Sequence, residues 1–417
     1  MNFTIRKRKN KMNVNSEQIQ FDASVVVAQD QPLTPNGIFE ALRHWLGQKN
    51  VSKEIILGKR VIVYNNSETK IILLAKCITY LGNPHPIFKK RIQLPEWYQI
   101  FCNNIEKNKP EYDVRFIGIY HYNGNIVFVD FIKDTYMQHG LHNSSAHVYT
   151  NDIFQAMTYG VFRKEDKLGN TIVAVRNNKM KQYLDGKMQS QNTLFDLFRQ
   201  FNFGYPFGEW LYAFDIIRKM HKEKWSQWRQ AEWAGWFLEF EFDKFTRENN
   251  VQSQMRYIGC SNKHEGDLDF DIRFEESDFY GDLKASDIKK NETPGNDQEN
   301  LVECIYRYNK FWYVIYEHET KKDSDYGYEA TKARNHYIKS VDPSYDKDEM
   351  SYHSRMKHSV KFMRMTIIEL NKANFRDALK TFNQGKQPDG SARAPKFNIN
   401  KKTLENDNYV VFRYSYK

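Results

Sequence analysis

The chain has 417 residues, with 62 Lys and Arg against 52 Asp and Glu, which gives a formal net charge of +10 at pH 7. At roughly 100–200 residues per domain, this length provides two or three domains with well-buried cores. Apolar residues make up 40% of the chain and aromatic residues 15%. This composition excludes a disordered protein, because disordered chains lack the side chains that offset ordering entropy.

The sequence also argues against export and membrane insertion. No apolar run approaches the roughly 20 residues of a membrane-spanning helix, and the basic start has no apolar segment of a signal peptide behind it. The four cysteines are scattered without a CxxC pair, which argues against a disulfide framework or a zinc site. We therefore expect a cytoplasmic protein. Its basic charge is compatible with a nucleic-acid partner but does not establish one.

The first half of the chain predicts mixed α+β structure. Residues 1–16 are polar and basic and predict a mobile arm. Thr34 and Pro35 predict the cap and first turn of a helix. Asn123-Gly124 is a strong hairpin signal, because this pair favours the tight turn between antiparallel strands. The remaining pattern predicts strands over 24–27, 59–64, 69–74, 114–120, 125–132 and 171–175, and a helix over 152–159.

The second half has a more regular pattern. Apolar side chains at helical spacing predict one long helix over 221–245. The elements expected after it are strands over 255–259, 267–274 and 279–285, a helix over 296–308, a strand over 311–316, a helix over 329–338, and strands over 360–370 and 409–416. From the long helix to the strand over 311–316, the order is α-β-β-β-α-β.

Acidic residues mark the second of these strands. Residues 267–274 alternate strictly, which predicts Asp267, Asp269 and Asp271 on one face of the strand. Aligned like charges repel, and a divalent cation held by oxygen ligands would neutralise them. The alternative is an exposed hairpin whose acidic face is only solvated. The next strand presents Asp282 and Lys284, which are two residues apart and therefore share a face.

This arrangement suggests a metal-assisted hydrolysis. If Asp269 and Asp282 face each other across the hairpin, their carboxylates can share a Mg²⁺ ion. Lys284 can then hold or deprotonate a water that attacks phosphorus. The tripeptide alone is not specific, because four others fit the same pattern: Glu68-Thr-Lys70, Glu165-Asp-Lys167, Asp287-Ile-Lys289 and Glu319-Thr-Lys321. Asp282-Leu-Lys284 is singled out by its place in an apolar strand directly after the acid-bearing strand.

Asp269 and Asp282-Leu283-Lys284, set in the α-β-β-β-α-β order, resemble the core of the PD-(D/E)xK nucleases. Within that group the resemblance is to type II restriction endonucleases, and it covers roughly residues 220–340. It implies Mg²⁺ as the cofactor and one catalytic set: Asp269, Asp282, Lys284, Glu239 and Asp267. The metal ligands that the resemblance implies are Asp269, Asp282 and Asp267.

The sequence departs from the family pattern in two ways. Gly266, not Pro, precedes the first acidic residue, and the middle acid of the motif is Asp rather than the commoner Glu. The choice of the primary metal ligand among Asp267, Asp269 and Asp271 therefore stays open.

A nuclease site does not select a DNA sequence, so other side chains must hydrogen-bond to base edges. The polar segment 142–151 is rich in suitable side chains, although the alternative for it is a polar turn. The expected DNA contacts are His142, Asn143, Ser144, Ser145, His147 and, near the active site, Ser286. The family resemblance also implies a homodimer, because protein symmetry mirrors a two-fold DNA site, and a cognate DNA methyltransferase in the same system.

The sequence therefore predicts an α+β protein with a mixed-sheet, PD-(D/E)xK-like core and a large DNA-recognition region. Residues 1–215 are expected to recognise DNA, 216–345 to form the catalytic core, and 346–417 to complete the fold or the dimer. The expected activity is Mg²⁺-dependent, sequence-specific hydrolysis of double-stranded DNA. The alternatives are a repair or junction-resolving nuclease on the same core and a non-catalytic DNA-binding protein.

Overall fold

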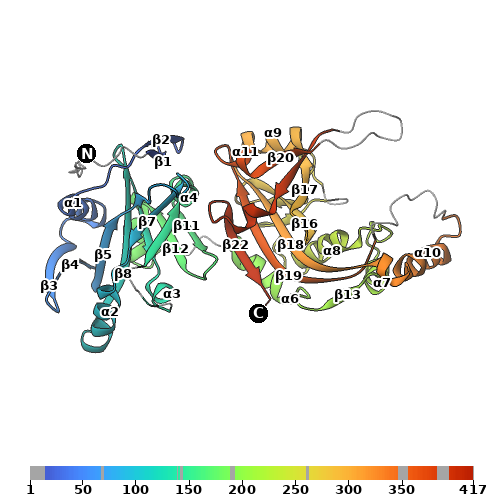
Figure 1. Ribbon diagram of the computed structural model, residues 1–417, viewed down its shortest axis with the longest axis horizontal. Helices are drawn as coiled ribbons and strands as arrows, with labels where there is room; N and C mark the ends of the chain where they lie inside the picture. Colours follow the sequence, from blue (N-terminus) through green and yellow to red (C-terminus); the bar gives the residue numbers. More distant parts are fainter. Residues whose placement is uncertain are drawn as a thin grey trace. The chain divides into compact units, whose positions relative to one another are not determined.

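The computed structural model of the chain describes residues 15–66, 70–138, 140, 144–187, 193–259, 263–345, 356–382 and 394–416. The chain divides into two compact units, Met1–Thr193 and Leu194–Lys417, which are described separately (Figure 1). All but the last two residues of the expected N-terminal arm lie outside the described part of the chain. Both units combine helices with sheets, so the predicted α+β class is confirmed.

The first unit is built on a seven-stranded sheet in which β5 and β8 are parallel and the other neighbours are antiparallel. Its strand order is β11 (Val161–Glu165), β12 (Thr171–Arg176), β9 (Asn125–Phe131), β8 (Tyr112–Tyr122), β5 (Lys70–Cys77), β4 (Lys59–Asn65) and β3 (Val51–Ile56). Two smaller sheets consist of β10 (Ser145–Tyr149), β7 (Lys89–Gln93) and β6 (Thr79–Tyr80), and of β1 (Asn15–Ile19) and β2 (Val25–Gln29). The helices are α1 (Pro35–Leu46), α2 (Trp97–Asn108), α3 (Lys133–Met137), α4 (Thr150–Tyr159), η1 (Asn177–Lys179) and α5 (Met180–Leu184).

Two local predictions for this unit are confirmed. Asn123 and Gly124 both have positive φ, +46° and +79°, as the tight turn between β8 and β9 requires. The Thr34 hydroxyl accepts a hydrogen bond from the backbone N–H of Gly37 at 3.0 Å, which caps α1. Signals of this kind depend only on neighbouring residues in the chain, so tertiary packing does not override them.

Apolar side chains cover both faces of the large sheet. On β9, Phe128 packs in a core with side chains of α1 and α5. Its neighbours Val127 and Val129 point to the opposite face and pack with side chains of α2 and α4. Burial on both faces explains why β8 and β9 are nearly continuous apolar runs.

The second unit has a mixed sheet with the order β13 (Trp210–Tyr212), β19 (Lys357–Leu370), β18 (Phe311–Lys322), β16 (Phe279–Asp287), β15 (Ile272–Phe274) and β14 (Arg256–Tyr257). The strand β22 (Val410–Ser415) also pairs with β19. A small sheet consists of β17 (Glu292–Asp297), β21 (Lys396–Asn400) and β20 (Leu379–Phe382). The helices are α6 (Thr193–Gly204), α7 (Ala213–Lys222), α8 (Trp233–Glu248), α9 (Gln298–Tyr308), η2 (Asp323–Tyr326), α10 (Glu329–Val341), α11 (Phe375–Ala378) and η5 (Lys401–Glu405).

The parallel pair β16 and β18 requires a crossover connection. The chain supplies it with β17 and α9. The helix starts where the Asp297 carboxylate accepts hydrogen bonds from the backbone N–H groups of Glu299 and Asn300, at 3.0 and 3.3 Å. Side chains of α9 pack with Tyr313 and Ile315 in one core. The order α8, β14, β15, β16, α9, β18 is therefore the expected one, with β17 as an added strand.

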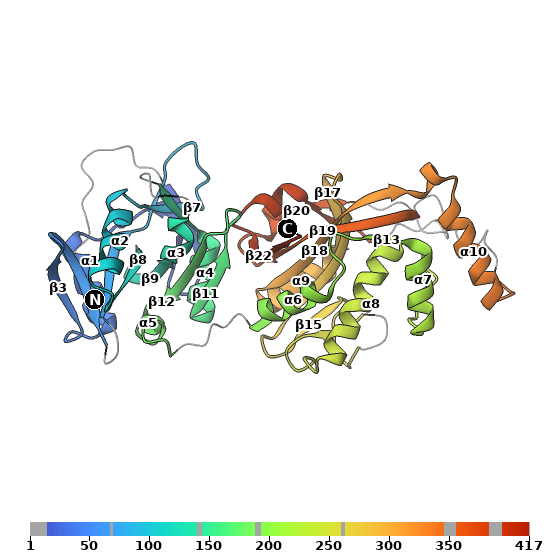
Figure 2. The ribbon, with the colours of Figure 1, turned by 90° about the horizontal axis from the view of Figure 1, so that it is seen from below.

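The boundary between the units lies at the start of α6 and not near residue 215. Phe198 and Phe201 of α6 pack against Phe242 of α8, with ring centroids 6.0 and 5.4 Å apart. The segment 346–417, expected to complete the fold or the dimer, contributes β19 and β22 to the same sheet as β16. The long strands β18 and β19 run side by side in this sheet (Figure 2).

The single long helix expected over 221–245 is wrong, because two helices, α7 and α8, occupy this region. Lys224 has a left-handed φ of +59°, a conformation that does not continue a helix. The ring of Trp225 then packs against Phe240 and Tyr257, with centroids 5.6 and 5.7 Å apart. These contacts turn the chain back onto α8.

The strand expected over 267–274 is also shorter than predicted, because only Ile272–Phe274 forms β15. Before it the chain turns: the backbone N–H of Phe270 donates to the carbonyl of Leu268 at 3.0 Å. The three acids of this segment therefore do not share one face of a strand.

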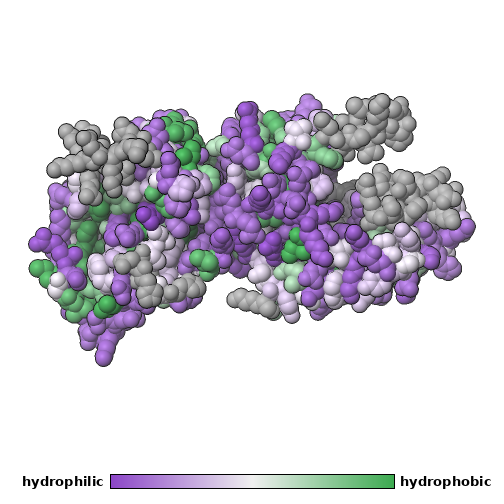
Figure 3. Space-filling view, in the orientation of Figure 1, coloured by the Kyte–Doolittle hydropathy of each residue, from purple (hydrophilic) through white to green (hydrophobic). Residues whose placement is uncertain are grey.

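None of the helices in the described ranges has the length and apolar content needed to cross a membrane. The face seen in Figure 3 is largely hydrophilic, in keeping with the mean hydropathy of –0.76. Exposed large apolar side chains such as Ile55, Leu168 and Phe203 are far apart in the sequence.

Candidate active site

The pairing of β15 with β16 brings two acidic residues together. The strands are antiparallel with Ile272 opposite Gly281. Asp271, directly before β15, therefore lies beside Asp282 on β16. The backbone N–H of Leu283 donates a hydrogen bond to Asp271 Oδ2 at 2.9 Å. This bond ties the Asp271 carboxylate to the strand that carries Asp282.

Gly281 allows these strands to approach each other closely. A Cβ atom at this position would lie 2.9 Å from the carbonyl oxygen of Trp312 and 2.9 Å from the ring of Phe274. Real Cβ atoms do not approach other atoms so closely, so only glycine fits. The residue before Asp282 is therefore fixed by packing, and with it the position of the acid.

Asp282 is almost completely buried, at 2% exposure. Its carboxylate forms an ion pair with Lys284 Nζ, as expected of residues that share one face of a strand. Asn296 of β17 donates a hydrogen bond from Nδ2 to Asp282 Oδ1 at 3.0 Å. Burial opposes the charged form of Lys284, but the carboxylates of Asp282, Asp271 and Glu239 outweigh it and raise the pKa of Lys284.

Glu239 of α8 is the third acid of the group. The Tyr257 hydroxyl donates a hydrogen bond to Glu239 Oε2 at 2.6 Å. Burial raises the pKa of Glu239 to about 7, and the charge of Asp282 adds to this although Tyr257 and Lys284 act in the opposite direction. Burial, reinforced by Asp282 and Glu239, also holds the pKa of Asp271 well above its usual range. Glu239 thus lies with Asp282 and Lys284, as expected, and Asp271 joins them.

The charges of this group are suited to a divalent cation. Three carboxyl groups share the one ammonium group of Lys284, and burial makes their mutual repulsion costly. Mg²⁺ binds proteins through one or two carboxylates and keeps several waters, and Asp271 and Asp282 supply two such groups. Within the described ranges, no three His, Cys, Asp or Glu side chains converge as a metal-binding group. A cation here would complete its coordination with water and neutral oxygen atoms.

Asp269 and Asp267 do not join this group, and the expectation that Asp269 faces Asp282 is wrong. The Asp269 side chain is 79% exposed and pairs with Lys263. Asp267 Oδ2 accepts a hydrogen bond from Arg256 Nη2 at 3.0 Å and another from a backbone N–H of its own turn at 2.8 Å. Because the chain turns before β15, these two acids point elsewhere. The place expected for Asp269 is taken by Asp271.

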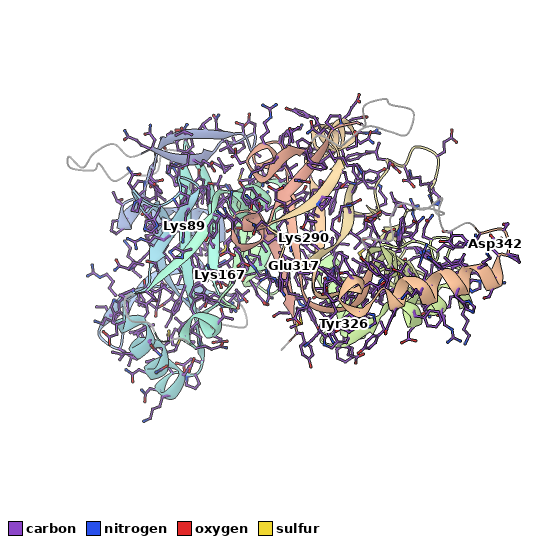
Figure 4. All side chains as sticks on the ribbon, turned by 45° about the vertical axis from the view of Figure 1, so that its right-hand side comes forward. Lys89, Lys167, Lys290, Glu317, Tyr326 and Asp342 are labelled. Carbon is purple, nitrogen blue, oxygen red and sulfur yellow. The ribbon has the colours of Figure 1, made fainter. Side chains whose placement is uncertain are left out.

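Ser286 follows Lys284 on the same face of β16 but is buried. Its Oγ accepts a hydrogen bond from Thr293 Oγ1 at 2.7 Å, so the position does not support a contact with DNA. Glu317 of β18, labelled in Figure 4, lies opposite Ser286 in register. It pairs with Arg364 and, at 3.0 Å, with Lys401 Nζ. Two cations balance this buried carboxylate, so it adds no uncompensated charge to the site.

The other expected DNA contacts belong to the first unit, and two of them, His142 and Asn143, lie outside the described residues. The carbonyl of Ser144 accepts a hydrogen bond from the backbone N–H of Leu94 at 2.8 Å. Ser145 Oγ accepts one from Arg91 Nη1, also at 2.8 Å. His147, on the edge strand β10, lies opposite Arg91 of β7 in the strand register. Two of these three residues, Ser145 and His147, thus lie beside the cationic side chain of Arg91 on β7.

Asn296 and Tyr257 were not identified from the sequence. Asn296 lies where a helix was expected to begin, and Tyr257 belongs to a predicted apolar strand. The sequence signal for Asn296 is its position: it is a polar residue that follows the strand with Asp282 and Lys284 and directly precedes Asp297, the cap of α9. No spacing in the sequence marks Tyr257.

One comparison with known proteins gives a match. Residues 69–184 match the sequence model of a family described as methylase-associated X1. The matched segment lies in the first unit, covers rather more than a quarter of the chain and does not include the acidic group around Asp282. No curated protein and no solved structure matches the chain.

Proposed function

We propose that the protein is a Mg²⁺-dependent endonuclease of the type II restriction class, which cleaves double-stranded DNA at specific sequences. The observation that carries the proposal is the group formed by Asp271, Asp282, Lys284 and Glu239. The order α8, β14, β15, β16, α9, β18, with β16 and β18 parallel, agrees with the PD-(D/E)xK core that the motif implies.

The side chains support distinct roles in phosphodiester hydrolysis. Asp271 and Asp282 would hold the Mg²⁺ ion, which when bound lowers the pKa of a water and stabilises charge on phosphate oxygens. The raised pKa of Lys284 keeps it charged, so its role is to stabilise the negative charge that develops on the phosphate rather than to remove a proton. Glu239, with a pKa of about 7, is able to accept a proton near neutral pH.

The charge of the first unit supports DNA as the partner. Residues 1–193 contain 26 Lys and Arg against 16 Asp and Glu, whereas residues 194–417 contain 36 of each kind. The whole positive excess therefore belongs to the first unit, where it would supply sequence-independent affinity for the phosphate backbone. We assign DNA recognition to this unit and a symmetric homodimer to the active form.

The match of residues 69–184 to the methylase-associated X1 family supports a restriction–modification context. In such a system the cognate DNA methyltransferase protects the host sites that the nuclease would otherwise cut. We therefore propose a methyltransferase of the same system as the functional partner of this protein.

Incubation of the purified protein with plasmid DNA, with and without Mg²⁺, tests the proposal. We expect discrete fragments only with Mg²⁺. Asp282→Ala and Lys284→Ala should abolish cleavage while DNA binding persists. Intact plasmid under all conditions would contradict the proposal in favour of a non-catalytic binding protein. Random degradation, or a preference for branched DNA, would replace it with another nuclease activity on the same core.

A further inference from the structure

Asn296 lies beside the acidic group, near the end of β17 and just before α9. Its Nδ2 donates to Asp282 Oδ1 at 3.0 Å, and its backbone N–H donates to the Tyr313 hydroxyl at 3.1 Å. Together these bonds hold both the backbone and the amide group of Asn296. Because Nδ2 faces the carboxylate, Oδ1 of the same amide lies next to Asp282 but does not bond to it.

The Oδ1 atom of Asn296 is buried and has no hydrogen-bond partner among the described residues. Buried polar oxygens in proteins generally bind a donor, a water or an ion. The Asp282 carboxylate that Nδ2 bonds lies beside the Asp271 carboxylate, which the backbone N–H of Leu283 holds, so two acidic side chains converge at the group that Asn296 contacts. An amide oxygen is a ligand that divalent cations accept and that adds no further negative charge.

We propose that Asn296 has two functions in the site: Nδ2 holds Asp282 in place, and Oδ1 is a neutral ligand of the divalent cation, directly or through one water. This inference rests on the proposed metal-dependent function and extends it to a residue outside the motif. Asn296 would thereby add a neutral oxygen ligand to the two carboxylates that Asp271 and Asp282 offer to the cation.

Asn398 of β21 provides a matched control in the same small sheet. Its Nδ2 donates to Glu292 Oε2 at 2.9 Å, and its Oδ1 is likewise buried without a hydrogen-bond partner in the part of the chain that the structure describes. The difference between the two residues is the carboxylate that each one holds. Glu292 is partly exposed to solvent and pairs with Lys380, whereas Asp282 belongs to the acidic group.

The test measures Mn²⁺ binding by the full-length protein without DNA, from the paramagnetic resonance signal of the free ion. Asn296→Ala should weaken the affinity for Mn²⁺ roughly 10-fold or more, in line with the loss of groups that support metal ligands. Asn398→Ala should leave it unchanged. Asn296→Asp keeps an oxygen at the ligand position and should bind Mn²⁺ more tightly than Asn296→Ala. If Asn296 only braced Asp282, a second carboxylate would repel it and Asn296→Asp would bind no better.

Two outcomes overturn the inference alone: an unchanged affinity in Asn296→Ala, or an Asn296→Asp variant as weak as Asn296→Ala. In both cases loss of Mn²⁺ binding in Asp282→Asn would leave the proposed nuclease site standing. If the wild-type protein shows no Mn²⁺ binding that depends on Asp282, the inference and the metal-dependent function fail together. Circular dichroism checks the fold of each variant, and Asn296→Ser replaces Asn296→Ala if that variant does not fold.

Discussion

The backbone N–H of Leu283 donates a hydrogen bond to the carboxylate of Asp271. This bond holds Asp271, rather than Asp267 or Asp269, beside Asp282 and Lys284. A side chain held by the backbone of the motif strand moves with that strand. Asp282 and Lys284 flank Leu283 on the same strand, so one short segment positions three of the four proposed site residues.

Asp271 and Asp269 should therefore differ sharply in their importance. We expect Asp271→Asn to lower the rate of DNA cleavage by a factor on the order of 100 or more, because it removes a proposed ligand of the Mg²⁺ ion that stabilises charge on the phosphate oxygens. Asp269→Asn, two residues away on an exposed side chain, should cleave at nearly the wild-type rate. Single-turnover cleavage of a DNA substrate compares them. A large loss in Asp269→Asn with none in Asp271→Asn would contradict the assignment.

Glu239 should make the metal-free protein less stable as the pH rises. Its pKa of about 7 exceeds the ordinary value of 4.5, so the native state keeps a proton that the unfolded chain releases. Between these two values the native state binds more protons, and the free energy of unfolding falls with increasing pH. The raised pKa of Asp271 acts in the same direction.

Glu239→Gln should make this decline shallower. Urea unfolding of both proteins between pH 4 and 8, in the presence of EDTA, gives the two slopes. Equal slopes would show that Glu239 does not carry the raised pKa in the folded protein.

Mg²⁺ should stabilise the folded protein through Asp282. A ligand at ten times its Kd adds about 1.4 kcal/mol to the free energy of unfolding. For a unit of this size we expect a rise in Tm of roughly 3–5 °C. In Asp282→Asn the rise should disappear, whatever the Tm of the metal-free variant. Differential scanning calorimetry with and without Mg²⁺ measures the difference, and an equal rise in both proteins would place the cation elsewhere.

Replacement by alanine should lower the free energy of unfolding at Gly281 and raise it at Gly235. A methyl group at Gly281 meets the Trp312 carbonyl and the Phe274 ring at 2.9 Å, and such overpacking costs about 1–3 kcal/mol. At Gly235, inside α8, the methyl group meets no atom within 4 Å. Gly235→Ala should raise the free energy of unfolding by at most about 1 kcal/mol, because alanine has the higher helix propensity. Chemical denaturation measures both, and a stable Gly281→Ala protein would contradict the close packing of the strands.

Much of the fold was predictable because its signals are local. The Asn123-Gly124 turn and the Thr34 cap depend on a few neighbouring residues, and both are confirmed. The break between α7 and α8 was not predictable from apolar spacing, since it depends on how Trp225 packs against residues of a helix and a strand that follow it. Tertiary contacts of this kind override a pattern that reads as one helix.

The site was predicted in part for the same reason. Asp282 and Lys284 share a strand, so their spacing alone places them on one face. The choice of Asp271 over Asp269 depended on where β15 begins. The alternation of acidic and apolar residues starts at Asp267, but the strand itself starts only at Ile272. Glu239 was identified through the family resemblance. Asn296 and Tyr257 reach the site by tertiary folding, which no spacing in the sequence records.

The register of β15 and β16 has a consequence for how this sequence can change. Only three residue pairs join the strands, and successive side chains of a strand point to opposite faces. Adding or deleting one residue in the turn over 275–278 would shift the pairing by one position and bring an apolar neighbour of Asp271, either Ile272 or Phe270, beside Asp282 in its place. Such a change would remove a proposed metal ligand while every site residue stayed in the sequence. The length of an exposed turn is therefore expected to be as restricted among active relatives as the acids themselves.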